Sequence, residues 1–434
     1  MSNETNMIKG RSRKRAFLFS FVAFLLVLLL LEGLFRLIGA GSEKGVDPRR
    51  LAIAHNLNHF VNSLEMFINV EGREGGRTLY VDDPQLMWKL RPNFKGRARD
   101  LFQAALAEEA PEWSFTTNKY GFRGPNFEIE REPGVYRIVA LGDSSTFGFG
   151  VSDGDGYPER LCAELRRKCP TCRFEMINLG VPGYSTEQGI ILAEQWIARL
   201  NPQAVTISYG TNDWWKREYS DADEMARLCS AWAKLGRIAR KSALVRGIGS
   251  LLGRGEPKNQ SGNPPLVPRV SIDRFRENIE KIAEIAQRAG ARVILMDNNF
   301  YVPYGTEALV SLAREHPDYA LIDSVGILAS RLHDIDDLRR KYPQSINIAI
   351  RQYPRVIQSR PIFLLMVDPI HPNPTGHQII AEALADEIMS RGSVSESVNE
   401  MLRHTMSLPP LQGIGGGFLN RTALEIRAGL AREE

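Results

Sequence analysis

From Tyr136 onward, short apolar runs alternate with longer amphipathic stretches, and this alternation constrains the fold more than any other feature of the chain. Apolar runs of strand length that alternate with helices are typical of a parallel sheet whose two faces are covered. We predict strands at Tyr136–Leu141, Phe174–Leu179, Ala204–Tyr209, Ala291–Asp297 and Tyr319–Asp323.

The stretches between these strands have apolar residues at helical spacing, as Phe275, Ile279 and Ile282 show. Asn373 precedes Pro374 and is expected to cap the last helix, because Asn accepts hydrogen bonds from a first turn and Pro is tolerated there. We predict helices at Tyr157–Lys168, Thr186–Arg199, Ile272–Arg288 and 374–389. The predicted fold class is therefore α/β, with a helix layer on each side of a parallel sheet.

The N-terminus is basic and is followed directly by an apolar run. Residues 1–15 account for the whole formal net charge of +4, so the remainder is close to neutral and a nucleic-acid partner is not expected. Residues 16–38 form a run of about 23 residues, the length of a bilayer span. Within it, Glu32 and Arg36 are four residues apart and could pair on a helix.

A cleaved signal peptide is the alternative, but the run is longer than a usual signal region and no clear A-x-A site follows. We expect residues 1–15 to be cytoplasmic and residues 16–38 to be a single-pass anchor in the inner, cytoplasmic membrane. The rest of the chain would then be periplasmic or extracellular.

The segments around the predicted sheet have different textures. Residues 41–130 are expected to form a small N-terminal module, with a possible helix at Leu51–Val70. Residues 131–391 would hold the domain built on the sheet, interrupted by an insertion at 214–271 that could be a lid, a binding element or a disordered segment. No chemistry is expected in the tail at 392–434.

The cysteines and the known cofactor motifs give no indication of a metal or cofactor. Cys169 and Cys172 form a C-x-x-C pair, but no second pair and no nearby His accompany it, so either a local disulfide or free thiols is expected. The sequence has no P-loop and no H-E-x-x-H, and Asp153 stands where a G-x-G-x-x-G motif that begins with Gly148 and Gly150 would need its third glycine. It also has no G-x-S-x-G, the nucleophile turn of the α/β-hydrolase fold, so that fold is disfavoured.

Four short polar segments mark a candidate site. The sequence GDS at 142–144 follows the first predicted strand, N-x-G-x-x-G at 178–183 the second and G-x-N-D at 210–213 the third, whereas D-x-x-H-P at 368–372 precedes the last helix. GDS alone could be an ordinary turn. Because the carboxyl ends of parallel strands meet at one edge of a sheet, we expect the segments to converge there.

In this order the segments resemble blocks I, II, III and V of the SGNH/GDSL hydrolases, a superfamily of esterases, lipases, thioesterases and carbohydrate deacylases on a flavodoxin-like sheet. The resemblance covers residues 115–391, and residues 118–123 look like a stretch of membrane-anchored bacterial members. It implies a three-layer α/β/α sheet fold and a serine ester hydrolase that needs no cofactor.

The resemblance also implies the roles of single residues. Ser144 would be the nucleophile, His371 the base that takes and returns its proton, and Asp368 the carboxylate that orients His371. The oxyanion donors would be the backbone N–H groups of Ser144 and Gly183 and the side-chain amide of Asn212.

Neighbouring residues have competing interpretations. Ser145 could be the nucleophile, but the motif register favours Ser144. Asp143 is expected to fix the turn and Asp213 to hold its own loop rather than to take part in catalysis.

Three further side chains near the motifs are expected to be structural or to line a pocket. His377 should lie inside the last helix as a packing or surface residue. Trp214 and Trp215 could either line an acyl or sugar pocket or pack in the interior.

These features predict a hydrolase that acts through an acyl-enzyme on an O-acyl ester of a glycan, a lipid or a small molecule, outside the cytoplasmic membrane. The alternatives are an O-acyltransferase that modifies an envelope glycan and a non-catalytic envelope assembly protein. The presence of Ser144, Asn212, Asp368 and His371 disfavours the non-catalytic alternative. The sequence does not indicate the oligomeric state.

Overall fold

The computed structural model describes residues 22, 26–27, 29–34, 36, 68–71, 79–100, 112–229, 266–300 and 302–390. The chain divides into two compact units, the first made of residues 1–56 and 226–264 and the second of residues 57–225 and 265–434. The second unit holds the sheet and all of the motifs.

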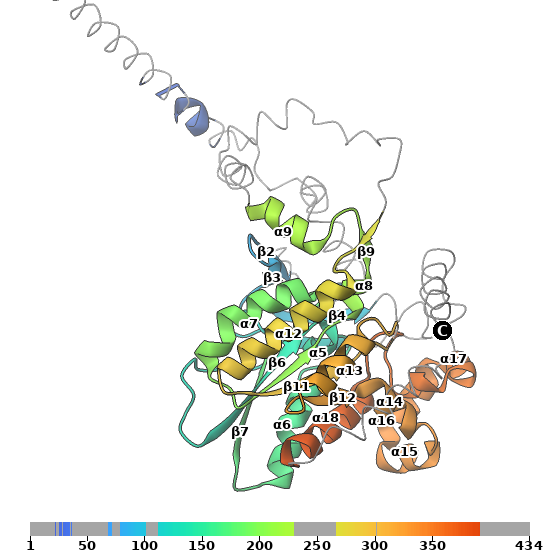
Figure 1. Cartoon of the computed structure of the whole chain (residues 1–434). Helices are drawn as coiled ribbons and strands as arrows, with labels where there is room; N and C mark the ends of the chain where they lie inside the picture. The colour runs from blue at the N-terminus through green and yellow to red at the C-terminus, as the bar shows by residue number, and fades with distance from the viewer. Residues whose placement is uncertain are drawn as a thin grey trace, which may run out of the picture. The chain divides into compact units, whose positions relative to one another are not determined.

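The centre of the second unit is a parallel sheet of five strands (Figure 1), β6 (Val135–Gly142), β7 (Arg173–Asn178), β8 (Ala204–Ser208), β11 (Arg292–Asp297) and β12 (Ala320–Asp323). Its order is β12-β11-β8-β6-β7, and every pairing is parallel. Taken in chain order this is the 2-1-3-4-5 arrangement of flavodoxin-like sheets. All the predicted strands are confirmed, each within one residue of its expected ends.

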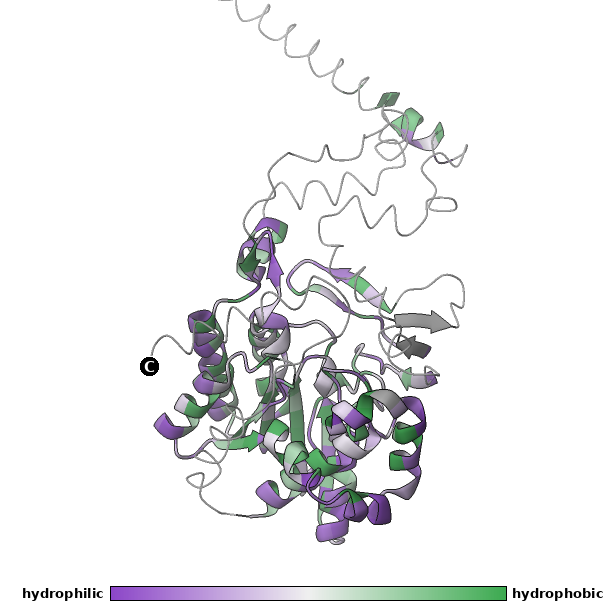
Figure 2. Cartoon of the chain, turned by 90° about the vertical axis from the view of Figure 1, so that its right-hand side faces the viewer, coloured by the Kyte–Doolittle hydropathy of each residue, from purple (hydrophilic) through white to green (hydrophobic). Residues whose placement is uncertain are grey.

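Helices cover both faces of this sheet. On one face α7 (Thr186–Leu200) packs against α12 (Ile272–Arg288), and on the other α18 (Pro374–Met389) packs against α6 (Tyr157–Lys168) and α14 (Ser324–Arg331). The expected three-layer architecture and the predicted helices are confirmed, because their apolar stripes meet strands that are buried on both faces. Figure 2 shows apolar residues gathered on the strands and on the inner sides of these helices.

Shorter elements connect or extend these layers. In chain order, α5 (Ser144–Phe147) follows β6, and α8 (Thr211–Trp214), β9 (Lys216–Arg217) and α9 (Asp221–Cys229) follow β8, whereas β10 (Val267–Pro268) precedes α12 and pairs with β9. Between β11 and α18 they are α13 (Thr306–Glu315), α15 (Ile335–Lys341), α16 (Pro343–Gln352), α17 (Pro354–Ser359) and the 3₁₀ turn η2 (Pro361–Leu364). Cys169 and Cys172, just after α6, form a disulfide, which decides between the alternatives for this pair.

The N-terminal module contributes antiparallel strands. β1 (Ile68–Glu71) and β5 (Glu112–Thr116) flank β4 (Lys95–Asp100), and β2 (Tyr80–Asp83) forms a hairpin with β3 (Met87–Leu90). The helix expected to end at Val70 is wrong at that end, because residues 68–70 belong to β1 and pair with β4. Residues 51–67 lie outside the described part of the chain.

Most of the predicted membrane span at 16–38 also lies outside the described residues, as do the basic tail at 1–15, residues 230–265 of the insertion and the tail at 392–434. In the described part, Arg36 Nε donates to Glu32 Oε1 at 2.8 Å on helical backbone, which confirms their expected pairing. No described helix reaches the length and apolar character that a membrane crossing requires.

Candidate active site

Ser144 lies at the carboxyl end of β6, in the turn that starts α5. The side chain of Asp143 caps this short helix by accepting the N–H of Ser145 at 2.9 Å. Gly142 is required by close packing: a Cβ here would lie 2.0 Å from Thr146 Oγ1 and 2.7 Å from the Ser208 carbonyl oxygen of β8. Glycine at position 142 therefore allows the end of β6, and with it the turn that carries Ser144, to lie directly against β8.

His371 and Asp368 reach Ser144 from the loop that precedes α18, 227 residues further along the chain. The Nε2 atom of His371 lies 2.8 Å from Ser144 Oγ, and its Nδ1 atom lies 2.7 Å from Asp368 Oδ2. The other carboxylate oxygen of Asp368 accepts the backbone N–H groups of Ile370 and His371, each at 2.7 Å. The structure thus brings together the three residues predicted as a triad.

This arrangement assigns the proton positions on the imidazole. When Nδ1–H is donated to Asp368, Nε2 has a free lone pair that can accept the hydroxyl proton of Ser144. The ring is held from a third side by Phe149, whose ring centroid lies 4.6 Å from that of His371. His371 can therefore act as a base toward Ser144 without reorienting.

The loop that carries the histidine is fixed at both ends. The N–H of Val367 donates to the His371 carbonyl oxygen at 2.9 Å. Asn373 caps α18 by accepting the N–H groups of Thr375 and Gly376 at 3.0 Å, and its amide donates to the Leu364 carbonyl oxygen at 2.9 Å. The predicted cap is confirmed, and it positions His371 two residues upstream.

The predicted oxyanion donors lie on loops around the same serine. Among the described residues, no acceptor binds the N–H of Ser144 or of Gly183. The N–H of Val181 donates to the Gly142 carbonyl oxygen at 3.1 Å, which brings the Gly183 loop beside the serine turn. Asn212 follows β8 and donates one amide hydrogen to Asp143 Oδ2 at 3.0 Å, which leaves its second amide hydrogen for a ligand.

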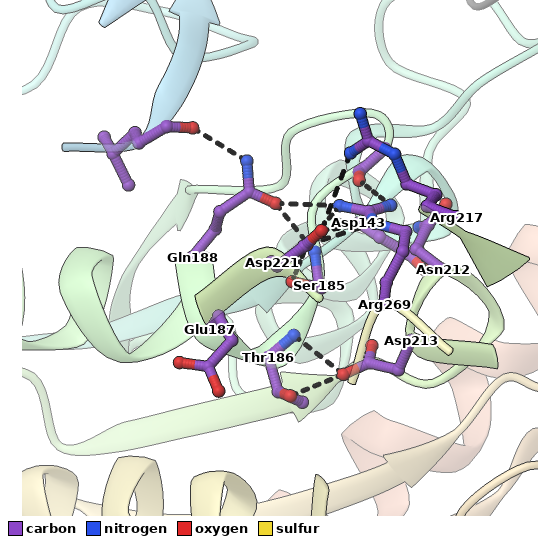
Figure 3. A network of polar contacts seen from close by, with 12 residues as sticks. Asp143, Ser185, Thr186, Glu187, Gln188, Asn212, Asp213, Arg217, Asp221 and Arg269 are labelled. Carbon is purple, nitrogen blue, oxygen red and sulfur yellow. Dashed lines mark hydrogen bonds and ion pairs between the residues drawn. The ribbon is translucent and has the colours of Figure 1, made fainter. Parts of the chain in front are cut away.

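A buried polar network connects these loops (Figure 3). Asp213 Oδ1 accepts the N–H of Thr186 at 3.0 Å and also its hydroxyl, and Ser185 Oγ donates to Asp221 Oδ2 at 2.6 Å. Asp221 in turn binds the guanidinium of Arg269. As expected, Asp213 holds its loop, and it does so by joining the loop after β8 to the start of α7.

Burial changes the acidity of several groups here. It raises the pKa of Asp143 to about 6, against the lowering effects of its Ser145 N–H bond and of His371. It raises the pKa of Asp213 to about 7. It lowers the pKa of His377 to about 3, and His377 Nδ1 accepts the N–H of Tyr157 at 3.2 Å. His377 is therefore a neutral packing residue, one of its expected roles.

The tryptophans after Asn212 differ in exposure. Trp214 is buried, whereas Trp215 is half-buried, and their rings meet edge to face with centroids 5.9 Å apart. Packing of Trp214 in the interior is thus observed.

Comparison with known proteins agrees with this geometry. The model of the GDSL-like lipase/acylhydrolase family matches residues 140–379, more than half of the chain. The chain belongs to this family. It is therefore an ester hydrolase on a parallel α/β sheet of the SGNH type.

Solved structures similar to this GDSL-like hydrolase include TesA, at 14% identity over 58% of this chain and 98% of that one, with a TM-score of 0.33. Axe2, an acetylxylan esterase from Geobacillus stearothermophilus, is 17% identical over 59% of this chain and 95% of that one, with a TM-score of 0.36. AlinE4, an SGNH-hydrolase family esterase, is 21% identical over 44% of this chain and 77% of that one, with a TM-score of 0.28. No curated protein matched the sequence.

The structure of this GDSL-like hydrolase also assigns roles that the sequence did not reveal. Asn178 Nδ2 donates to the Thr146 carbonyl oxygen at 2.9 Å and its Oδ1 accepts the N–H of Gly180 at 2.9 Å, so it ties β7 to the serine helix. A Cβ at Gly180 would lie 2.4 Å from Phe147 N. The N-x-G spacing of residues 178–180 was the available signal.

Arg123 is a further positioning residue in this GDSL-like hydrolase. Its buried guanidinium donates to the carbonyl oxygens of Gly148 at 2.5 Å and Val151 at 2.7 Å and to Asp153 Oδ1 at 3.1 Å. These bonds fix the loop that carries Phe149 against His371. The stretch at 118–123 indicated a family feature but not this role.

Proposed function

We propose that this enzyme is a serine hydrolase that cleaves O-acyl esters through an acyl-enzyme on Ser144. The observation that supports this most directly is the continuous hydrogen-bonded chain from Ser144 Oγ through His371 to Asp368, with distances of 2.8 Å and 2.7 Å. Each link has the polarity that proton transfer from serine to imidazole requires.

In the first half-reaction, His371 Nε2 takes the proton of Ser144 as Oγ forms a bond to the ester carbonyl carbon. The negative charge develops on the carbonyl oxygen, where the N–H groups of Ser144 and Gly183 and the amide of Asn212 donate hydrogen bonds. Each such donor contributes about 3 kcal/mol to transition-state stabilisation. Collapse breaks the ester C–O bond, and the alcohol leaves with the proton held by His371.

In the second half-reaction, water replaces the alcohol. His371 Nε2 takes a proton from the water as its oxygen bonds to the acyl carbon, and Ser144 then leaves with that proton. Asp368 stabilises the imidazolium that exists between the two transfers. The net reaction consumes the ester and one water molecule and releases the acid and the alcohol.

Replacement of Ser144 with Ala tests the nucleophile. Hydrolysis of p-nitrophenyl acetate and butyrate should fall at least about a thousandfold, because the covalent route is removed. Ser145→Ala is the matched control, since the Asp143 cap bonds the backbone N–H of Ser145 and not its hydroxyl. Turnover that survives in Ser144→Ala but disappears in Ser145→Ala would reassign the nucleophile.

A fluorophosphonate probe separates catalysis from a purely structural role. The probe should label the wild-type chain and Ser145→Ala but not Ser144→Ala. Absence of labelling in the folded wild-type chain would support a non-catalytic protein.

We propose in addition that residues 16–38 anchor the enzyme in the cytoplasmic membrane with the sheet on the outer side. The apolar run and the basic residues before it support this orientation. Esterase activity should sediment with membranes and should become soluble when residues 1–40 are deleted. Activity in the soluble fraction of cells that express the full chain would contradict the anchor.

A further inference from the structure

The peptide bond between Pro182 and Gly183 carries the N–H that the proposed mechanism uses as an oxyanion donor. Trp88 holds this peptide from its carbonyl side, since its indole Nε1–H donates to the Pro182 oxygen at 3.3 Å. The described chain has no cis peptide bonds. In a trans peptide the C=O and the N–H point in opposite directions, so the Gly183 N–H faces away from the indole.

The next peptide is held as well. Arg269 Nη1 donates to the Gly183 carbonyl oxygen at 2.8 Å, and Arg269 is fully buried. Its guanidinium is fixed by Asp221, with Nε 3.0 Å from Oδ1 and Nη2 2.7 Å from Oδ2 (Figure 3). Gly183 has a φ of 84°, a conformation that suits glycine. Both peptide planes that meet at Gly183 are therefore clamped by buried donors.

Further contacts fix Trp88 in this place. The hydroxyl of Tyr184 donates to the Trp88 carbonyl oxygen at 2.5 Å, and Gln188 Nε2 donates to the Leu86 carbonyl oxygen at 2.8 Å. The ring of Trp88 meets that of Tyr184 edge to face at 5.6 Å, and the Arg269 guanidinium lies 5.8 Å from the indole. The β2–β3 hairpin is thus docked onto the loop that carries Gly183.

We propose that Trp88 is a positioning residue of the oxyanion hole, and that the β2–β3 hairpin is therefore part of the catalytic apparatus. Trp88 lies before residues 140–379, which the family model matches. The proposal rests on the proposed function, in which the Gly183 N–H binds the oxyanion. Such donors act only when they are held at hydrogen-bond distance from the developing charge.

Trp88→Phe in the full chain tests this proposal, because phenylalanine keeps an aromatic ring against Tyr184 and lacks the N–H that binds Pro182. With p-nitrophenyl acetate, kcat should fall about tenfold, a part of the effect of losing a whole donor. KM should stay within about twofold and the pH profile should not move, since the triad is untouched. The rate of fluorophosphonate labelling should fall in parallel, because that reaction places a phosphoryl oxygen in the same hole.

Trp196→Phe is the matched control. Trp196 lies on α7 and packs against Tyr120, Phe122 and Phe127, away from the Gly183 loop. Its kcat should equal that of the wild type. Thermal unfolding of both variants separates a loss of folded enzyme from a loss of turnover per folded molecule.

A kcat for folded Trp88→Phe within about twofold of the wild type, or a change confined to KM, would overturn the proposal. If Trp88→Phe does not fold, Tyr184→Phe decides, since it removes only the hydroxyl that holds the Trp88 backbone: a lower kcat supports the proposal and an unchanged kcat overturns it. Failure of the proposed function looks different, because Ser144→Ala would then retain wild-type turnover.

Discussion

Asp213 follows Asn212, the proposed oxyanion donor, and is fully buried. Its Oδ1 accepts bonds from the N–H and hydroxyl of Thr186, whereas its Oδ2 has no hydrogen-bond partner among the described residues. Burial of this carboxyl group raises the pKa of Asp213 to about 7 from an ordinary value of 3.8. The folded protein therefore favours the protonated carboxyl, and ionisation destabilises it.

The sign of this effect predicts a pH-dependent stability. Because the folded pKa lies above the unfolded one, the stabilising contribution of Asp213 is complete below 3.8 and is lost as the pH rises to about 7. Each pKa unit corresponds to about 1.4 kcal/mol, so this shift changes the free energy of unfolding by a few kcal/mol across that pH range. Asp213→Asn should remove this dependence and gain stability relative to the wild type between about pH 5 and about pH 8.

Urea unfolding of the wild type and of Asp213→Asn, at about pH 5 and at about pH 8, measures how much stability the variant gains as the pH rises. Other buried carboxyls, such as Asp143, contribute to the wild type and the variant alike, so the comparison isolates Asp213. If the wild type and Asp213→Asn differed in free energy of unfolding by the same amount at both pH values, Asp213 would not cause the pH dependence.

A second prediction at this scale concerns Asp368. In Asp368→Asn the amide oxygen can still accept the N–H groups of Ile370 and His371, but the amide nitrogen faces His371 Nδ1. This favours the tautomer whose Nε2 carries the proton and cannot accept that of Ser144. We expect kcat to fall by about 10⁴ with little change in thermal stability. A loss below about tenfold in steady-state kinetics would show that Asp368 does not set the tautomer.

At the scale of elements, α18 connects the stability of the fold to the position of the base. Its cap, Asn373, makes hydrogen bonds with Thr375, Gly376 and Leu364. The helix packs against α6 and α14 and so closes one face of the sheet. The element that buries much of the core therefore begins three residues after His371, directly after its cap.

Removal of this cap should lower both stability and turnover. Asn373→Ala should cost about 1–2 kcal/mol in the free energy of unfolding, the usual effect of a lost N-cap. Asn373→Asp is the control, since its carboxylate can still accept the two N–H groups, whereas the bond to Leu364 is replaced by repulsion between two oxygens. Denaturant unfolding should rank the wild type first, Asn373→Asp second and Asn373→Ala last; the reverse order of the variants would contradict this role.

The same scale shows where prediction from sequence succeeded. The bounds of α12 and α18 were predictable because each combines an apolar stripe with a polar cap, Ser271 and Asn373. The short helices α13 to α17 were not predicted, since between β11 and α18 no single periodicity lasts long enough. Residues 68–70 could not be predicted as a strand, because two apolar residues around one asparagine are too short a pattern and their pairing with β4 is a contact between distant segments.

For the whole molecule, the described part of the N-terminal module, residues 68–71, 79–100 and 112–130, belongs to the same compact unit as the sheet. The buried guanidinium of Arg123 donates to carbonyl oxygens of the loop that follows Ser144, and the indole N–H of Trp88 donates to the carbonyl oxygen of Pro182. The triad could be predicted because short motifs carry it. These long-range contacts could not, since a tryptophan 94 residues before its acceptor belongs to no local pattern.

Because Arg123 and Trp88 bond to loops of the sheet, we expect a chain without the N-terminal module not to fold. A chain that begins at residue 131 lacks Arg123 and Trp88, so buried carbonyl groups lose their donors at about 1–3 kcal/mol each, and the core loses the aromatic residues of β3 and β5. We expect it to be unfolded by circular dichroism and cleaved rapidly by protease, unlike the full chain. A cooperative thermal transition in this fragment would show that the module is separable.

The separation of 227 residues between Ser144 and His371 has a consequence for synthesis. A ribosome that adds about 5–20 residues per second leaves the serine without its base for roughly ten seconds or more. For the later part of that interval, once Arg269 has been added, the nascent chain holds Ser144 and both donors that fix the Gly183 peptides, but it lacks α18, which packs on one face of the sheet. On the proposed mechanism, the nascent chain is therefore inactive until His371 and the helix that follows it have been synthesised.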